Sequence, residues 1–168
     1  ISCVCRLQHR GAMDADAKTG DGTGVLTQIP YDLFRPEVEK MGHKLFRNND
    51  LAVGVLFLPR KEEYEIGICH KVIKEVLQEK GLILFGFRKV PIKMNVLGDK
   101  ALETCPEFEQ ALIGRSPDSS LSDLDYEKTL FLCRNEIEDR VSAAGVKHFY
   151  IPSFSSRTIV YKGLLTSL

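Results

Sequence analysis

The run Gly11-Ala12-Met13-Asp14-Ala15-Asp16-Ala17-Lys18-Thr19-Gly20-Asp21-Gly22 decides how the rest of this chain is interpreted. It is introduced by Leu7-Gln8-His9-Arg10 and continues into Thr23-Gly24-Val25-Leu26. Glycines punctuate a polar stretch, and apolar and β-branched residues follow it. The pattern therefore predicts a turn, with glycines that accept positive φ, leading into a strand.

Three ligand chemistries were weighed for this loop. A dinucleotide fingerprint needs its glycines between a strand and a helix, whereas here a polar loop precedes and a strand follows. A Walker loop needs a Gly-Lys-Ser/Thr ending, which is absent. A calcium loop starting at Asp14 would place Lys18 at a ligand position, where it would repel the cation. A nucleotide-binding module at residues 20–24 is kept only as a third possibility, behind the two hypotheses given below.

Apolar periodicity outward from the loop predicts alternating strands and helices. Helices are expected at residues 31–41, 62–80, 106–113 and 126–141, with residues 1–8 fitting the end of another. Strands are expected at residues 24–29, 51–58 and 82–87, the last two buried, and extended segments at 90–96, 148–151 and 158–164. Thr104 and Gly114 are interpreted as the start and stop signals of the helix at 106–113, and residues 115–123 as a surface loop. Since nothing repeats and no linker divides the sequence, one mixed α and β unit is expected.

The composition argues against nucleic-acid binding, binding to an anionic membrane and a membrane span. The 23 basic residues equal the 23 acidic ones, so no net field favours nucleic acid or an anionic membrane. No apolar run reaches the roughly 18 residues of a membrane helix. The chain opens at Ile1 without a signal-peptide pattern, and we expect residues upstream of it.

The five cysteines are odd in number and scattered, at Cys3, Cys5, Cys69, Cys105 and Cys133. They indicate free thiols in a reducing intracellular compartment, either cytoplasm or an organelle stroma or matrix. Cys3-Val4-Cys5 lacks the partner ligands of a zinc site, so packed thiols are the better interpretation and no metal site is expected.

Several separated stretches together resemble one family. They are residues 7–12 and 14–24, Gln28-Ile29-Pro30, Leu51-Ala52-Val53-Gly54, Phe57-Leu58-Pro59-Arg60, Arg88-Lys89-Val90-Pro91, Pro106-Glu107-Phe108-Glu109-Gln110, Phe149-Tyr150-Ile151 and Ser155-Ser156-Arg157-Thr158-Ile159-Val160-Tyr161-Lys162-Gly163. In order and spacing they resemble the N-terminal glutamine amidotransferase domain of the glutamate synthase large subunit, a class II, N-terminal-nucleophile hydrolase domain. The resemblance implies an α+β fold, part of a four-layer αββα sandwich with mainly antiparallel sheets, and makes residues 1–168 a partial domain of this type.

The same resemblance implies a reaction and also shows what these residues lack. In the family a terminal cysteine attacks the glutamine amide, with its own α-amino group as base, and ammonia passes to a distant flavin site. That cysteine would precede Ile1, and the arginine, asparagine-glycine pair and aspartate that hold glutamine would follow Leu168. Cys3 and Cys5 are not terminal and do not match the nucleophile. The N-terminal nucleophile segment and the C-terminal half of the domain are thus absent from these 168 residues.

Arg10 and Gly11 are the substrate-binding candidates, because they resemble residues of the family's pocket wall; a surface arginine paired with a carboxylate remains the alternative for Arg10. No catalytic residue, cofactor or metal ligand is expected in the chain, since FMN and the iron-sulfur cluster would belong to other domains. His43, His70 and His148 are expected to be solvated or core residues isolated from any carboxylate cluster, and Arg157 and Lys162 to form salt bridges.

Two functions are carried forward. The first is a segment of the glutamine-hydrolysing domain of a glutamate synthase, inactive alone. The second is a degenerate amidotransferase-like structural or assembly subunit of a larger complex, in effect a pseudoenzyme. The expected partners are the remainder of a glutamate synthase or a larger complex, with glutamine only where the missing segments are present, and neither nucleic acid nor a membrane span.

Overall fold

The computed structural model describes residues 22–60 and 62–164. Contacts divide the chain into two compact units, a larger one of residues 27–90 and 106–159 and a smaller one that, in the described part, comprises residues 22–26, 91–105 and 160–164. The described elements mix helices with antiparallel sheets, so the expected α+β class is confirmed.

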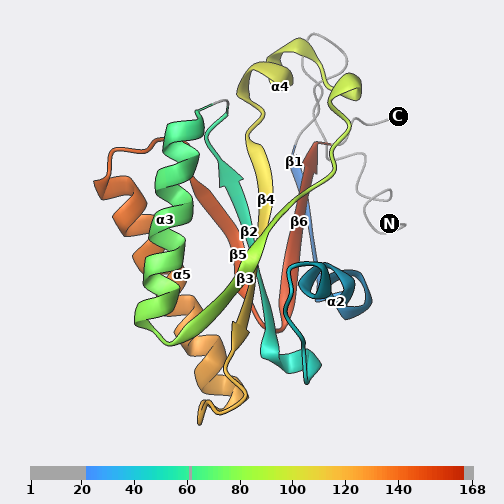
Figure 1. Ribbon diagram of the computed structural model, residues 1–168. Helices are drawn as coiled ribbons and strands as arrows, with labels where there is room; N and C mark the ends of the chain where they lie inside the picture. The colour runs from blue at the N-terminus through green and yellow to red at the C-terminus, as the bar shows by residue number, and fades with distance from the viewer. Residues whose placement is uncertain (1–21, 61, 165–168) are drawn as a thin grey trace. The chain divides into compact units, whose positions relative to one another are not determined.

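A four-stranded antiparallel sheet forms the centre of the larger unit (Figure 1). Its strand order is β3-β4-β2-β5, with β2 at Leu51–Leu58, β3 at Leu82–Lys89, β4 at Glu107–Arg115 and β5 at Tyr150–Ser155. The register pairs Leu51 with Gly114 across β2 and β4, and Gly54 with Phe154 across β2 and β5. Strands β1 (Gly22–Gln28) and β6 (Thr158–Leu164) pair in a separate two-stranded sheet.

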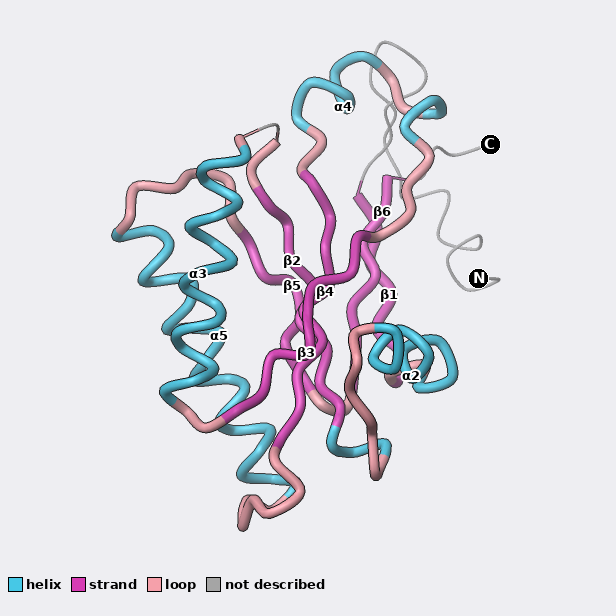
Figure 2. Tube along the Cα trace, in the orientation of Figure 1, coloured by secondary structure: helices cyan, strands magenta, loops and turns pink. Residues whose placement is uncertain are grey.

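Two helices cover one face of the four-stranded sheet, and a third lies on the opposite face (Figures 1 and 2). Helices α3 (Glu63–Glu79) and α5 (Asp123–Ala143) pack side by side there, with Cys69, Ile73, Leu130 and Ile137 fully buried. Helix α2 (Tyr31–Lys40) places Phe34 and Val38 against Leu51, Val53 and Leu112 on the other side. Strand β2 is therefore buried on both faces, as its continuous apolar run predicts.

The helices expected at 31–41, 62–80 and 126–141 are confirmed with small shifts of their ends, and the buried strand expected at 51–58 is confirmed with the same ends. The strands expected at 24–29 and 82–87 also form, and the extended segment expected at 158–164 is β6. Of the extended segment expected at 148–151, only the last two residues belong to a strand, β5, and His148 has a positive φ of 63°. Strand β3 is half-buried rather than buried, since it lies at an edge of the sheet. The helix end expected at residues 1–8 lies outside the described residues.

The helix expected at residues 106–113 is wrong, because this stretch is β4. Glu, Gln, Ala and Leu favour a helix locally, but β2 and β3 hydrogen-bond to both sides of the segment, and tertiary pairing overrides a weak local preference. Gly114 is not a helix stop, since it lies within β4. A glycine is needed there because a side chain would collide with the ring of Phe85. The extended segment expected at 90–96 is also wrong, since residues Met94–Val96 form a 3₁₀ turn ahead of α4 (Asp99–Thr104), whose last residue is Thr104.

No helix in the described part of the chain is long and apolar enough to cross a membrane.

Candidate functional site

The two residues predicted to line a glutamine pocket, Arg10 and Gly11, lie outside the described residues. So do Cys3 and Cys5 and the loop up to Asp21. The predicted pocket wall therefore stays a prediction, and the candidate site in the described part of the chain consists of other residues.

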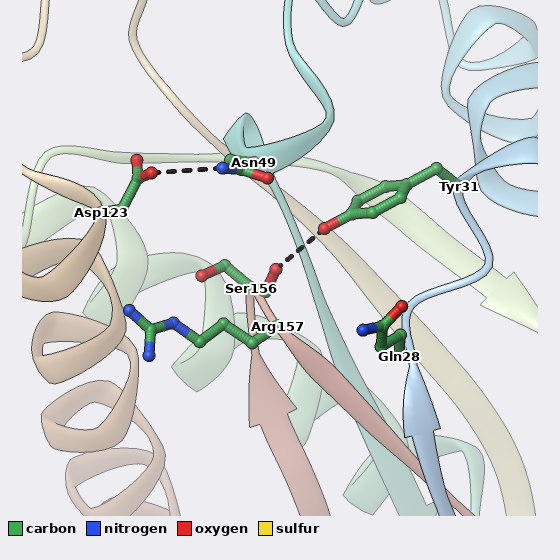
Figure 3. A pocket seen from close by; sticks show the side chains of 6 residues that line it. All are labelled: Gln28, Tyr31, Asn49, Asp123, Ser156 and Arg157. Carbon is green, nitrogen blue, oxygen red and sulfur yellow. Dashed lines mark hydrogen bonds between the residues drawn. The ribbon is translucent and has the colours of Figure 1, made fainter.

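A polar cavity of about 330 Å³ opens in the larger unit, lined by side chains from five segments (Figure 3). Gln28 ends β1, Tyr31 begins α2, and Asn49 belongs to the 3₁₀ turn Asn48–Asp50. Asp123 begins α5, and Ser156 with Arg157 forms the turn between β5 and β6. This volume lies at the lower end of the range of small-molecule sites, but the lining is more polar than is usual for them.

The turn that carries Arg157 is fixed by a carboxylate on α5. Glu127 accepts hydrogen bonds from the Ser155 hydroxyl at 2.5 Å, the Ser156 hydroxyl at 2.7 Å and the Ser156 backbone N–H at 2.9 Å. The Ser155 hydroxyl oxygen in turn accepts from the backbone N–H of Arg157 at 3.0 Å. Hydrogen bonds to a charged acceptor are strong, so the turn has one well-defined conformation.

A second network fixes the opposite wall of the cavity. Arg115, only 4% exposed, donates to Asp50 at 2.9 Å and to Asp123. Asp123 also accepts from the Asn49 amide at 3.2 Å (Figure 3). The surface loop expected at 115–123 is confirmed at residues 116–122, whereas Arg115 is buried at the end of β4 and Asp123 begins α5. A guanidinium in the interior needs carboxylate partners, and Asp50 and Asp123 supply them.

These contacts, together with burial, shift the pKa values of Asp123, Asp50 and Tyr31. Hydrogen bonds from Arg115 and Asn49 hold the pKa of Asp123 below its ordinary value. Burial alone would raise the pKa of Asp50, but hydrogen bonds from Arg47 and Arg115 outweigh it and lower that pKa. Burial, with Asp123 and Glu127 nearby, raises the pKa of Tyr31, whose hydroxyl donates to the Ser156 carbonyl at 3.2 Å. Both aspartates are therefore ionised and Tyr31 is neutral near neutral pH.

Among the described residues that line the cavity, none is an activated nucleophile. The Ser156 hydroxyl donates to a carboxylate, Glu127, and no imidazole is among the residues that line the cavity. A serine nucleophile needs a positioned general base, which is usually a histidine. The guanidinium of Arg157 is exposed and makes no ion pair with another described residue, contrary to the expected salt bridge.

The other predicted polar residues lie elsewhere. His70 is not isolated from carboxylates, because its ring contacts Glu109 at 2.7 Å and stacks on Phe87 at a centroid distance of 3.9 Å. His43 packs against Phe85, and His148 is exposed. The side chain of Lys162 lies next to Gly24, where an added Cβ would be 3.3 Å from Lys162 Cδ.

The described cysteines are poor nucleophiles and offer no cluster site. Cys69 in α3, Cys133 in α5 and Cys105 just past the end of α4 are all buried. Burial raises the pKa of Cys69 to about 12 and that of Cys133 to about 11. Among the residues that the structure describes, no group of three or more His, Cys, Asp or Glu is placed to hold a metal ion.

Sequence reasoning missed Gln28, Tyr31, Asn49 and Asp123, which come together only in the fold. A local signal did exist for the turn, since paired serines ahead of an arginine, between two extended segments, are typical of a side-chain-stabilised turn. Nothing local pointed to the partner of that turn, Glu127, which lies 29 positions away from Ser156.

Comparison with known proteins gives the family. The model for class II glutamine amidotransferases matches residues 1–168. The chain is 39% identical over 164 residues to the glutamate synthase [NADPH] large chain of Azospirillum brasilense, covering 98% of this chain and 11% of that protein. It is 38% identical to ferredoxin-dependent glutamate synthase 2 of Arabidopsis thaliana, over 96% of this chain and 10% of that protein. The large chain of Bacillus subtilis is 37% identical over 99% of this chain and 11% of its own length.

The chain therefore spans about a tenth of the length of these relatives. The family model covers every residue, and the observed α+β architecture with antiparallel sheets is consistent with that family's fold. The chain belongs to the class II glutamine amidotransferases.

Proposed function

We propose that the chain is part of the glutamine-hydrolysing, ammonia-releasing domain of a glutamate synthase. The observation that carries this proposal is the family match across all 168 residues, together with large chains of glutamate synthases as relatives at 37–39% identity. In this function the chain supplies a rigid scaffold, and Arg10 and Gly11 supply one wall of the glutamine pocket. The remainder of a glutamate synthase is the partner, and it holds FMN and the iron-sulfur cluster.

We further propose that the 168 residues alone do not hydrolyse glutamine. An N-terminal nucleophile needs a free α-amine beside its thiol, and the three described cysteines are internal and buried. Raised thiol pKa values at Cys69 and Cys133 further reduce thiolate at neutral pH. Free, buried thiols also support a reducing intracellular compartment as the place where the protein works.

The test compares two polypeptides in a glutaminase assay that measures ammonia release. One is the 168-residue chain, and the other is the same chain joined to the family's terminal cysteine segment and its glutamine-holding segment. We expect activity only from the second, and we expect Arg10→Ala to reduce it by raising KM. Turnover by the 168 residues alone, with modification of Cys3 or Cys5 by a glutamine-analogue electrophile, would overturn the proposal of inactivity.

A structural or assembly role is the second candidate, and one surface favours it. Leu124, Phe131 and Leu132 on α5 are 53%, 59% and 58% exposed, and with Phe154 they line an apolar groove. Exposed apolar groups in one patch mark contact sites. Size-exclusion chromatography of the chain with and without Phe131→Ser and Leu132→Ser tests this role. Identical elution and identical binding of an apolar dye by both forms would exclude it.

A further inference from the structure

The N-terminal half of α5 carries apolar side chains on two opposite sides of the helix. One stripe is buried against the sheet and α3 (Figure 1), and consists of Tyr126, Leu130, Cys133, Ile137 and Val141. The other stripe, formed by Leu124, Phe131 and Leu132, is more than half exposed. The spacing of these three residues places them on one side of the helix. A helix that is apolar on two sides is typical of one that is covered on both.

The exposed stripe lines a groove of about 520 Å³ in the larger unit. Phe154 of β5 also lines this groove and is itself 5% exposed, so the groove reaches from the surface of α5 down to the sheet. Apolar side chains that are scattered singly over a surface need no explanation, whereas a group of them in one groove marks a contact site. We therefore expect another polypeptide segment to cover this groove.

The sheet edge beside the groove is protected against an added strand. Strand β5 is the last in the strand order, but its Ile151 N–H donates to Glu138 at 3.1 Å. The Ser156 N–H, just past the strand, donates to Glu127 at 2.9 Å. Pro152 lies between them and has no N–H to offer. The covering segment is therefore expected to contact the groove through its side chains and not by pairing with β5.

The charge that the groove offers to a partner is positive. Its one carboxylate, Glu127, is already occupied by the Ser-Ser turn. Lys128 is 64% exposed and contacts Asp125 only at 3.4 Å, so this surface pair is weak. Arg134 lies 3.6 Å from Glu138, and its buried Nε donates no hydrogen bond to any described residue. A buried N–H without an acceptor is unfavourable, so Arg134 favours a partner that brings a carboxylate.

We propose that this groove binds an amphipathic helix from the part of a glutamate synthase large chain that lies outside these 168 residues. Its apolar side chains contact Leu124, Phe131 and Leu132, and a carboxylate beside them pairs with Arg134. The proposal rests on the proposed function in one respect, that these residues are part of a longer large chain; they span about a tenth of the length of their relatives. A helix laid in an apolar groove is a common way to bind through side chains alone. A segment of the same polypeptide is held at high effective concentration, so a groove of modest size suffices.

Photo-cross-linking in the complete large chain that contains these residues tests the proposal. The photoreactive residue is introduced by Phe131→p-benzoylphenylalanine, and Tyr64→p-benzoylphenylalanine is the control, because Tyr64 is 82% exposed on α3 and does not line the groove. We expect Phe131 to cross-link to one helical peptide outside the 168 residues, with a carboxylate within one turn of the attachment point, and Tyr64 not to label that peptide. A mixture of unlabelled and heavy-isotope-labelled protein distinguishes contact within one chain from contact between two copies. A cross-link to a second copy, to an extended segment or only within the 168 residues would overturn the proposal, and so would no cross-link.

A charge exchange tests the role of Arg134. Arg134→Glu is expected to lower the yield of this cross-link about two- to fivefold, the range for an exposed ion pair, while Lys147→Glu, which changes an exposed charge away from the groove, leaves it unchanged. Lysine in place of the partner carboxylate should restore the yield in Arg134→Glu, which a merely structural role of Arg134 would not explain. An unchanged yield in Arg134→Glu would overturn the pairing with a carboxylate.

Ammonia release from glutamine, measured on the same large chain, separates this proposal from the proposed function. Ammonia release without a cross-link outside the 168 residues overturns the helix in the groove and leaves the proposed function standing. The expected cross-link without ammonia release supports the helix in the groove and counts against the proposed function alone.

Discussion

Replacement of Arg115 by methionine is expected to destabilise the protein strongly, because Arg115 is a buried cation with several partners. Its side chain is 2% exposed, donates to Asp50 at 2.9 Å and to the Leu121 carbonyl at 3.0 Å, and lies 5.1 Å from the Tyr126 ring centre. Removal of one partner of a buried pair costs about 3–5 kcal/mol. Arg47 still contacts Asp50 at 2.9 Å, so we expect the lower end, about 3 kcal/mol.

Urea unfolding measures this loss, and thermal unfolding should show a Tm lower by about 6–12 °C for a chain of this size. Arg140→Met is the matched control, since Arg140 pairs with Glu79 and Glu136 on the surface and its loss should matter little. Equal losses in the two variants would refute the argument that burial makes the Arg115 pair important.

The pH dependence of stability gives a second test of the ion pair between Arg115 and Asp50. The pKa of Asp50 is lowered in the folded protein, so its contribution to stability is complete above its ordinary pKa of about 4 and is lost as the pH falls through the folded value. The difference in unfolding free energy between wild type and Arg115→Met should therefore shrink from about pH 7 to about pH 3 and below. A difference that stays constant over this range would show that lost packing, and not lost charge pairing, explains the variant.

Substitutions at two positions and one labelling experiment test the packing and the turn. Gly54→Ala places a Cβ 2.5 Å from the Phe154 ring and should cost about 1–3 kcal/mol in urea unfolding, with partial recovery in the double variant that also carries Phe154→Leu. Glu127→Gln removes the charge that holds the Ser-Ser turn and should cost about 1–3 kcal/mol, while Glu127→Asp, being shorter, should not restore it. Cys69 and Cys133, whose thiol pKa values burial raises to about 12 and about 11, should resist iodoacetamide in the native protein and react in urea, as mass spectrometry of the peptides will show. If either thiol in the native protein reacted as fast as an exposed cysteine, the result would contradict its burial.

Local patterns predict those elements of this fold whose burial follows a simple period. Helix α3 is an example, since it buries the residues that its own periodicity selects, and the unbroken apolar run of β2 likewise predicts a strand buried on both faces. Strand β4 (Glu107–Arg115) is not predicted in this way, because its sequence contains helix-forming residues. It forms a strand because it pairs with a neighbouring strand on each side. Strand pairing joins residues far apart in sequence, and no local window contains that information.

The candidate site was less predictable than the fold for the same reason. Arg115 pairs with Asp50 across 65 positions, and His70 pairs with Glu109 across 39. A sequence shows that such residues can carry charge but not that a partner lies opposite, so the sequence predicted neither pair. Family resemblance carried the functional prediction instead, and it pointed to Arg10 and Gly11 rather than to the cavity.

Helix α5 contributes side chains both to the polar cavity and to the edge of the four-stranded sheet. Strand β5 lies at the edge of the four-stranded sheet, where free backbone N–H groups invite pairing with another chain. Two carboxylates of α5 cap such groups, Glu138 at the Ile151 N–H and Glu127 at the Ser156 N–H just past the strand. A shift of α5 by one turn would uncap both groups and move Asp123 from the cavity wall, because all three side chains project from one rigid helix. The geometry of the cavity is thus set by the same contacts that protect the sheet edge, and a mutation that loosens α5 should distort the cavity and expose that edge together.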